Sequence, residues 1–228
     1  MKTRELEINV LPWEYRGTDC MRVGFSGSSG VGKTTLAKAV NEYLQYKFVP
    51  EGVREWLTRN GVESLRDLTP KASMKMQLTL QRERQIVERA NLRCVSDRTS
   101  LNNAMYCLYW NGREESLQRG VMDYVRDCTI HAVKTYDIIF MIPMGQFDIE
   151  DDGTRSKLIA YQLCMQNLIN NAVRSAEPIY YVHLVQAVNL EERVIECMDI
   201  IDKAFDVKAK HIPEGKIPAP DNVGRIIQ

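Results

Sequence analysis

Short apolar runs alternate along this chain with longer segments in which apolar residues recur every three or four positions. Five runs have the length and composition of β-strands: residues 20–26, 46–50, 93–96, 136–143 and 179–185. Strand-like runs separated by helical patterns are typical of a parallel sheet whose connections are helices. The last two runs are continuously apolar, which predicts strands covered on both faces. The pattern therefore predicts an α/β fold with a central parallel sheet.

Helix signals lie between these runs. Thr69 followed by Pro70 is an N-cap and first-turn pair, and it predicts a helix that extends to about Ala90. Residues 113–132 carry one apolar stripe at helical spacing, which predicts a second amphipathic helix.

The two ends of the chain fall outside this alternation. Residues 4–11 alternate polar and apolar positions, which predicts an extra strand within an N-terminal extension, residues 1–19. No linker-like stretch interrupts residues 20–207, so we expect one domain there. Residues 208–228 are rich in Pro and Gly and predict an extended tail.

The composition is that of an ordinary globular protein and narrows the function classes. Among 228 residues, Lys plus Arg and Asp plus Glu number 30 each, so the net charge is zero. Binding to a nucleic-acid backbone relies on a basic face, and this balance argues against it. The charged N-terminal segment is unlike a secretory signal, and no apolar run is long enough for a membrane span. We expect a cytoplasmic protein, in the host cytoplasm if the chain is viral.

Residues 24–40, GFSGSSGVGKTTLAKAV, contain a full phosphate-binding loop (P-loop) pattern, preceded by an apolar strand and followed by an amphipathic helix. Inward-pointing N–H groups and the helix dipole cradle phosphates in such loops. We expect Lys33 to reach the β- and γ-phosphates and the Thr34 hydroxyl to ligate Mg²⁺. The predicted nucleotide-binding residues of the loop are Gly27, Ser28, Ser29, Gly30, Val31, Gly32, Lys33, Thr34 and Thr35.

A second signal follows the 93–96 strand. Asp97 emerges at the carboxyl edge of the sheet, beside the P-loop, where a carboxylate can hold Mg²⁺ through water. The adjacent Arg98 can clamp a phosphate or a substrate anion. The alternative is a surface pair in which Asp97 caps a helix, but the preceding strand and the upstream P-loop favour function.

Glu51 lies beyond another predicted strand, with Arg54 three residues later. A carboxylate there can accept the proton of an attacking hydroxyl, so Glu51 is a candidate base and Arg54 a candidate substrate contact. A helix-capping Glu paired with Arg54 explains the same residues equally well.

A third arginine lies in the polar segment 143–156, among several acidic residues. A segment of this kind can close over the phosphates, with Arg155 stabilising the charge that develops during transfer. For Asp151 and Asp152, a solvated acidic loop is a serious alternative.

Weaker candidates are Gln77, Tyr106 and Arg193. Gln77 shares a helix face with Gln81 and Gln85 and is placed to read base edges, although a solvated face is the simpler interpretation. Tyr106 suits stacking on a ring or core packing. Arg193 follows the last strand, where such folds often place the adenine.

Taken in order, these motifs resemble the P-loop kinase-like ATPase family of bacteria and phages. They are also similar to thymidylate kinases, deoxynucleoside kinases and the ribosylnicotinamide kinase domain of NAD regulators. The resemblance covers about residues 20–205. It is carried by the P-loop, Val49-Pro50-Glu51 with Arg54, Asp97-Arg98 with Ala104 and Tyr106, Tyr136-Asp137 to Pro143, Asp151-Asp152-Gly153 with Arg155, and Glu191-Glu192-Arg193.

The resemblance implies a three-layer P-loop NTPase fold: a five-stranded parallel sheet in the order 2-3-1-4-5, helices on both faces and a lid. It implies that Asp97 serves Mg²⁺, Arg98 the acceptor side and Arg155 the lid, and it suggests Glu51 as the base. The thymidylate-kinase pattern has an aromatic residue after Asp-Arg, whereas Thr99 stands here. Thymidylate itself is therefore doubtful as the acceptor.

The sequence thus predicts an ATP- and Mg²⁺-dependent kinase that transfers the γ-phosphate to a nucleoside- or nucleotide-like small molecule. One alternative is a phage-type kinase acting on 5-hydroxymethyl-uracil bases in DNA, which the zero net charge mildly disfavours. Another is a nucleotide-dependent ATPase or switch without a small-molecule acceptor. No membrane partner is expected, and the oligomeric state, a homodimer included, stays open.

Overall fold

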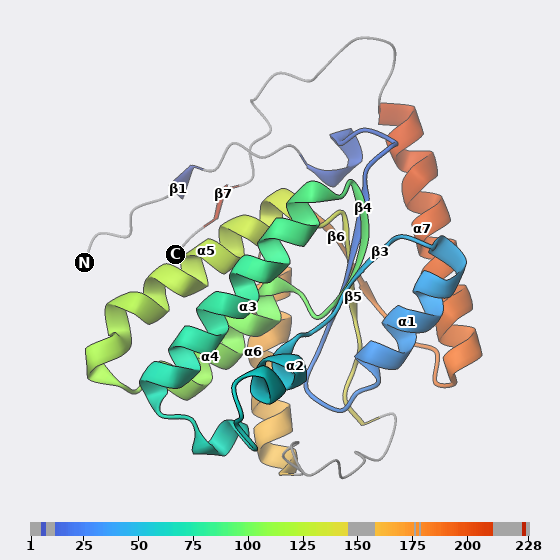
Figure 1. Ribbon diagram of the computed structural model, residues 1–228. Coiled ribbons are helices and arrows are strands. Elements are labelled where there is room, and N and C mark those ends of the chain that lie inside the picture. The colour runs from blue at the N-terminus through green and yellow to red at the C-terminus, as the bar shows by residue number, and fades with distance from the viewer. Residues whose placement is uncertain are drawn as a thin grey trace.

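The protein has a central sheet of five parallel strands (Figure 1). The computed structural model describes residues 6–7, 12–145, 158–175, 177, 179–211 and 225–226. The strands lie side by side in the order β3-β4-β2-β5-β6, which is 2-3-1-4-5 along the chain and confirms the predicted α/β P-loop fold. Their bounds are β2 (Met21–Ser26), β3 (Lys47–Val49), β4 (Arg93–Asp97), β5 (Ile138–Met141) and β6 (Tyr181–Leu184).

Helices cover both faces of this sheet (Figure 1). One face carries α1 (Lys33–Leu44) and α7 (Leu190–His211). The other carries α3 (Pro70–Ala90), α4 (Ser100–Asn111), α5 (Gln118–Thr135) and α6 (Ile159–Arg174). A short helix, α2 (Val53–Arg59), follows β3, and 3₁₀ turns occupy Trp13–Tyr15, Leu65–Asp67 and Glu115–Leu117.

The start of α3 is the one that the sequence predicts. The Thr69 hydroxyl oxygen accepts a hydrogen bond from the N–H of Ala72, and Pro70 occupies the first turn. This cap satisfies one of the N–H groups that a helix start leaves without a partner.

Strand register brings the chemical motifs to one edge of the sheet. β2 pairs in parallel with β4, so that Phe25 lies opposite Asp97. On its other side β2 pairs with β5, where Phe25 lies opposite Phe140. The P-loop therefore leaves the sheet next to the end of β4.

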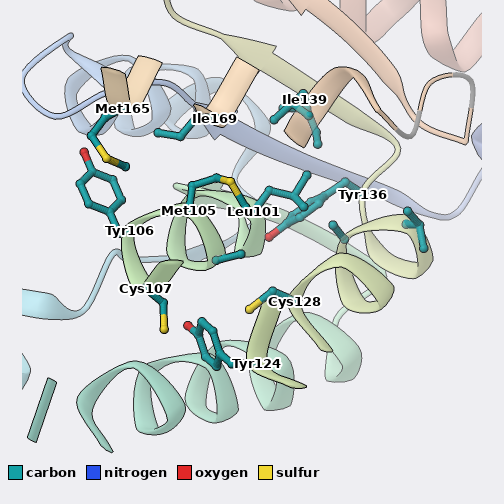
Figure 2. Packing of buried hydrophobic residues seen from close by; sticks show 14 of the residues in the cluster. Leu101, Met105, Tyr106, Cys107, Tyr124, Cys128, Tyr136, Ile139, Met165 and Ile169 are labelled. Carbon is teal, nitrogen blue, oxygen red and sulfur yellow. The ribbon is translucent and has the colours of Figure 1, made fainter. Parts of the chain in front are cut away.

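The core between the sheet and α3–α6 is built from side chains of several helices (Figure 2). All are buried, and burying each large apolar side chain contributes about 1.5–3 kcal/mol. The labelled members are Leu101, Met105, Tyr106 and Cys107 from α4, Tyr124 and Cys128 from α5, Met165 and Ile169 from α6, and Tyr136 and Ile139 at β5.

Two expectations differ from the structure. β5 is fully buried as predicted, but β6 is the outer strand of the sheet, and Tyr181 and Leu184 are 39% and 40% exposed. The prediction that 179–185 is covered on both faces is therefore wrong: Tyr181 and Leu184 project from opposite faces of the sheet, and both are partly exposed. In addition, α7 continues to His211, past the expected start of the tail at 208.

The end of α7 is fixed by a buried ion pair. The Lys208 ammonium is fully buried, lies 3.1 Å from the Asp137 carboxylate and donates to the carbonyl of Cys20. Arg16 approaches the same carboxylate at 3.6 Å. These contacts tie α7 and residues before β2 to the start of β5, and they hold the last turn of α7 helical.

Outside the main sheet, β1 (Leu6–Glu7) pairs antiparallel with β7 (Arg225–Ile226). β1 falls within the segment 4–11 for which the sequence predicts a strand. All six cysteines are free thiols, five of them buried and Cys164 exposed. In the described parts of the chain, no helix combines the length and apolar character needed to cross a bilayer.

Candidate active site

The P-loop joins β2 to α1 through glycines with positive φ angles, 142° at Gly27, 82° at Gly30 and 85° at Gly32. A Cβ at Gly27 would lie 2.6 Å from the carbonyl oxygen of Ile142, so only glycine fits. Gly32 is the N-cap of α1, and its left-handed conformation turns the chain directly into the helix. The other predicted nucleotide-binding residues, Ser28, Ser29, Val31 and Thr35, lie in this loop or in the first turn of α1.

Two side chains at the start of α1 connect the loop to its surroundings. The buried Lys33 ammonium donates to the carbonyl oxygen of Ser28 and so curls back over the loop. The Thr34 hydroxyl donates to Oδ2 of Asp97 at 2.7 Å. The predicted Mg²⁺ residues Thr34 and Asp97 are therefore in direct contact.

The oxygens of this pair fit Mg²⁺. Asp97 is 2% exposed, and its other oxygen, Oδ1, has no hydrogen-bond partner among the described residues. Mg²⁺ takes oxygen ligands and is usually held by one or two protein groups together with phosphates and water. No cluster of three or more His, Cys, Asp or Glu that could hold a metal occurs in the described part of the chain. An ion here would be coordinated largely by the nucleotide and water.

The second predicted pair lies on the neighbouring strand end. Glu51 follows β3, and its carboxylate lies 2.6 Å from the Arg98 guanidinium. Arg98 has a φ of 68°, a left-handed conformation that is uncommon for a residue other than glycine. This conformation directly follows β4, at the point where the chain turns from the strand toward α4.

Arg98 also lies over the ring of Tyr106, with 4.8 Å between the guanidinium carbon and the ring centroid. Burial alone would lower the pKa of this guanidinium, but the charge of Glu51 together with the smaller contributions of Tyr106 and Asp97 outweighs that effect, and the pKa is raised. Arg98 is thus a cation held between the carboxylate of Glu51 and the ring of Tyr106.

A buried arginine on α3 holds the two strand ends in place. Arg84 donates through one terminal nitrogen to the carbonyl of Arg98 at 2.8 Å, and through the other to the carbonyls of Asp97 and Pro50 at 3.0 and 3.2 Å. The residue is 4% exposed. One guanidinium therefore fixes the backbone next to Glu51, Asp97 and Arg98.

Glu88, one turn further along α3, is the counter-charge of Arg84 at 3.2 Å. Its carboxylate also accepts from the hydroxyls of Ser96 at 2.6 Å and Tyr136 at 2.9 Å, and lies 2.5 Å from Nε2 of His131. Burial alone would raise the pKa of Glu88, but the His131 hydrogen bond and the Arg84 charge outweigh it and lower the pKa. His131 thus belongs to a buried network.

Two other amide side chains on these helices are buried without full pairing. Gln81 is 2% exposed and Asn103 is 5% exposed; neither amide atom of Gln81 nor Nδ2 of Asn103 has a partner among the described residues. α3 and α4 run antiparallel, with Met74 meeting Cys107 and Arg84 meeting Arg98. Gln81 lies between the two α3 positions, and Asn103 lies one turn before Cys107. Both amides therefore belong to the faces through which α3 and α4 meet.

The remaining candidates are placed differently. The side-chain oxygen Oε1 of Gln77 accepts a hydrogen bond from the Tyr124 hydroxyl at 3.3 Å, so this amide contributes to the contact between α3 and α5. Arg54 is exposed on α2. Arg193 is 2% exposed, and its Nε donates to the carbonyl of Ala187 at 2.9 Å, which holds the loop after β6. Asp151, Asp152 and Arg155 lie outside the described residues.

Sequence reasoning missed Arg84, Glu88 and Asn103. A signal for the first two was present: they are charged residues four positions apart on the same face of α3 as Met74 and Gln81, a face that is otherwise buried. Charges on a buried face indicate an internal ion pair. No comparable signal in the sequence pointed to Asn103, because nothing in its neighbourhood distinguishes it from the adjacent Asn102.

Several solved structures superpose on this chain over most of its length. A deoxyadenosine kinase from M. mycoides with bound dCMP and dCDP superposes with a TM-score of 0.62 at 16% identity, covering 80% of this chain and 100% of the kinase. A thymidylate kinase from Ehrlichia chaffeensis gives 0.54 at 16% identity, covering 80% and 98%. The NadR protein in complex with NAD and AMP-PNP gives 0.61 at 16% identity; 88% of this chain is covered but only 52% of NadR.

At these identities the likeness concerns the fold. No curated protein matches the chain by sequence. The profile of a family described as an AAA domain matches residues 22–193, which is more than half of the chain and includes the P-loop, both strand-end pairs and Arg193. The chain belongs to this AAA-domain family and shares its α/β P-loop fold with deoxyadenosine and thymidylate kinases.

Proposed function

We propose that the protein is a kinase that uses ATP and Mg²⁺ to phosphorylate a nucleoside- or nucleotide-like small molecule. One observation carries the proposal: the Thr34–Asp97 hydrogen bond and the Glu51–Arg98 ion pair meet at consecutive residues, Asp97 and Arg98. The first pair suits the donor phosphates with their metal ion. The second offers a base and a cation to an acceptor, directly beside them.

Each residue has a role that follows from its position. Lys33 and the N–H groups of the P-loop offset charge on the donor phosphates. Bound at Thr34 and Asp97, Mg²⁺ would neutralise charge on the β- and γ-phosphates. Glu51 accepts the proton of the attacking acceptor hydroxyl, and Arg98 orients that acceptor or its phosphate.

The acceptor class follows from the unpaired amides. A buried amide without a partner lowers the stability of the fold by about 1–3 kcal/mol, and a ligand offsets this cost when it supplies the missing hydrogen bonds. Among the described residues, Gln81 has neither its donor nor its acceptor paired, and Asn103 adds an unpaired donor. The edge of a nucleobase or of a similar heteroaromatic ring presents donors and acceptors in one plane, which suits such groups.

The test is phosphate transfer from labelled ATP to a panel of nucleosides, nucleotides and ribosylnicotinamide. We expect transfer to at least one compound, with Lys33→Ala as the inactive control. Release of inorganic phosphate alone, with every compound unchanged, would contradict the proposal and leave an ATPase. A melting-temperature screen with a non-hydrolysable ATP analogue and Mg²⁺ would identify the acceptor by binding, because a ligand of the folded state raises the melting temperature.

A further inference from the structure

A single peptide group at the start of the P-loop is held from both sides. Its carbonyl, that of Gly27, accepts from Nδ2 of Asn102 on α4 at 2.8 Å. Its N–H, that of Ser28, donates to Oε1 of Gln166 on α6 at 2.8 Å. Two side-chain amides from two helices therefore bind the two polar ends of one peptide.

Each of these amides is anchored at its other end. Asn102 is fully buried, and its Oδ1 accepts from the Ser26 hydroxyl at 2.5 Å and from the N–H and hydroxyl of Thr99 at 3.3 and 3.0 Å. Nε2 of Gln166 donates to the carbonyl of Ile142 at 3.3 Å. The plane of the Gly27–Ser28 peptide is thereby fixed relative to β2, β5 and α4.

The next carbonyl along the chain, that of Ser28, accepts from the Lys33 ammonium. Rotation of the Gly27–Ser28 peptide would move this carbonyl and the ammonium with it. We infer that Asn102 and Gln166 are positioning residues that, through the Ser28 carbonyl, place Lys33 for the donor phosphates. The role ascribed to Lys33 rests on the proposed function.

Steric packing alone does not provide this control. Glycines at 27, 30 and 32 contribute no side chains, and all three have φ values in a region that other residues rarely adopt. A loop of this composition loses more conformational freedom on ordering than one with side chains. Hydrogen bonds from neighbouring helices supply the missing restraint.

The variants Gln166→Met and Asn102→Ser remove the clamp with little change of shape. Met keeps the length and helix propensity of Gln, and Ser is small enough for the buried site, so both chains are expected to fold. Matched controls lose a buried hydrogen bond elsewhere on the same helices. Ser100→Ala removes a 2.9 Å bond from α4 to the carbonyl of Cys128, and Tyr180→Phe removes a 2.6 Å bond to the carbonyl of Val173 on α6.

The measurement is the dissociation constant of a non-hydrolysable ATP analogue with Mg²⁺, beside the free energy of unfolding in urea. We expect each clamp variant to bind the analogue about tenfold more weakly, the equivalent of one hydrogen bond of about 1.4 kcal/mol. The controls should lose comparable stability with unchanged affinity. The double variant should lose less affinity than the sum, because either substitution already frees the peptide.

The decisive measurement combines Gln166→Met with Lys33→Met and compares the loss of analogue affinity with that in the wild type. If the clamp acts through Lys33, Gln166→Met adds little further loss of affinity to that of Lys33→Met, whereas a fully additive loss would overturn the inference. Unchanged affinity in both clamp variants would overturn it too. These results are distinct from failure of the proposed function: a chain whose affinity depends on the clamp but that transfers no phosphate would refute only the kinase proposal.

Discussion

Buried polar side chains on consecutive turns of α3 differ in how fully they are hydrogen-bonded. Arg84 and Glu88 are bonded to three backbone carbonyls, two hydroxyls, a histidine and each other. Gln81, less than one turn away and equally buried, has no hydrogen-bond partner for either amide atom among the described residues. Under the proposed function, Arg84 and Glu88 are structural residues and Gln81 is a ligand-binding residue. The paired turn stabilises the strand ends, whereas the unpaired turn carries a desolvation cost that a ligand can offset.

The largest effect is expected from breaking the paired turn. Glu88→Gln removes the counter-charge of a buried guanidinium, and loss of one partner of a buried ion pair costs about 3–5 kcal/mol. Urea unfolding measures the loss. The control is Glu83→Gln on the same helix, whose exposed pair with Arg59 at 3.2 Å should be worth less than about 1 kcal/mol. Similar losses of unfolding free energy in the two variants would mean that the buried Arg84–Glu88 pair contributes no more to stability than the exposed Arg59–Glu83 pair.

A pH titration tests the same turn without removing its volume. The folded-state pKa of Glu88 is lowered, so its carboxylate stabilises the fold above the ordinary value of about 4.3. That stability is lost as the pH falls through the lowered folded-state pKa. Unfolding free energies measured from neutral pH downward should therefore fall more steeply in the wild type than in Glu88→Gln. Equal slopes would mean that Glu88 is not ionised in the fold.

Replacing the amide of Gln81 should not lower stability, in contrast to the replacement of Glu88. Gln81→Leu removes two buried polar atoms that have no partner in the described parts of the chain, so stability should stay constant or rise by about 1 kcal/mol. Acceptor affinity should fall about tenfold or more, because the hydrogen bonds offered to the ligand are gone. Gln85→Leu is the control, since Gln85 donates to Asp127 on the exposed side of the same helix. Destabilisation by Gln81→Leu would show that Gln81 is a scaffold residue like Glu88.

The smallest effect concerns thiol labelling, which reports whether α3, α4 and β4 stay closed. Burial raises the pKa of Cys94 to about 12 and that of Cys107 to about 11, so neither thiol forms appreciable thiolate at neutral pH. Mass spectrometry after brief alkylation should find Cys164 modified and these two protected. Gln81→Leu should keep the protection and Glu88→Gln should reduce it. Fast labelling of Cys107 in the wild type would indicate that α3 and α4 separate readily.

The sequence predicted the parts of the molecule that depend on local pattern. The P-loop, the strand ends that carry Glu51 and Asp97, and the cap of α3 each follow from residues close together in the chain. The strand order came from the resemblance to a family, because apolar periodicity does not determine which strands become neighbours. β6 was misjudged for that reason: its composition is that of an inner strand, but its place is at the edge.

Partners across the fold could not be predicted from the sequence. Helical periodicity put Gln77 and Gln81 on one face of α3. The packing of α5 decides that the Tyr124 hydroxyl bonds to Gln77, while Gln81 has no such partner among the described residues. Likewise, the spacing of Glu51 and Arg54 gave no indication that Arg98 comes within 2.6 Å of Glu51 from the end of the neighbouring strand. Choices of this kind depend on packing angles that only the assembled layers define.

The buried carboxylate of Asp137 has a practical consequence for where the folding unit ends. Its two cations, Arg16 and Lys208, lie just outside the interval 20–207 that the sequence marks as the domain, and further outside the matched family region 22–193. A fragment cut at either pair of limits would leave an uncompensated charge at the base of β5. The shortest fragment that keeps both cations beside Asp137 runs from before Arg16 to the last turn of α7.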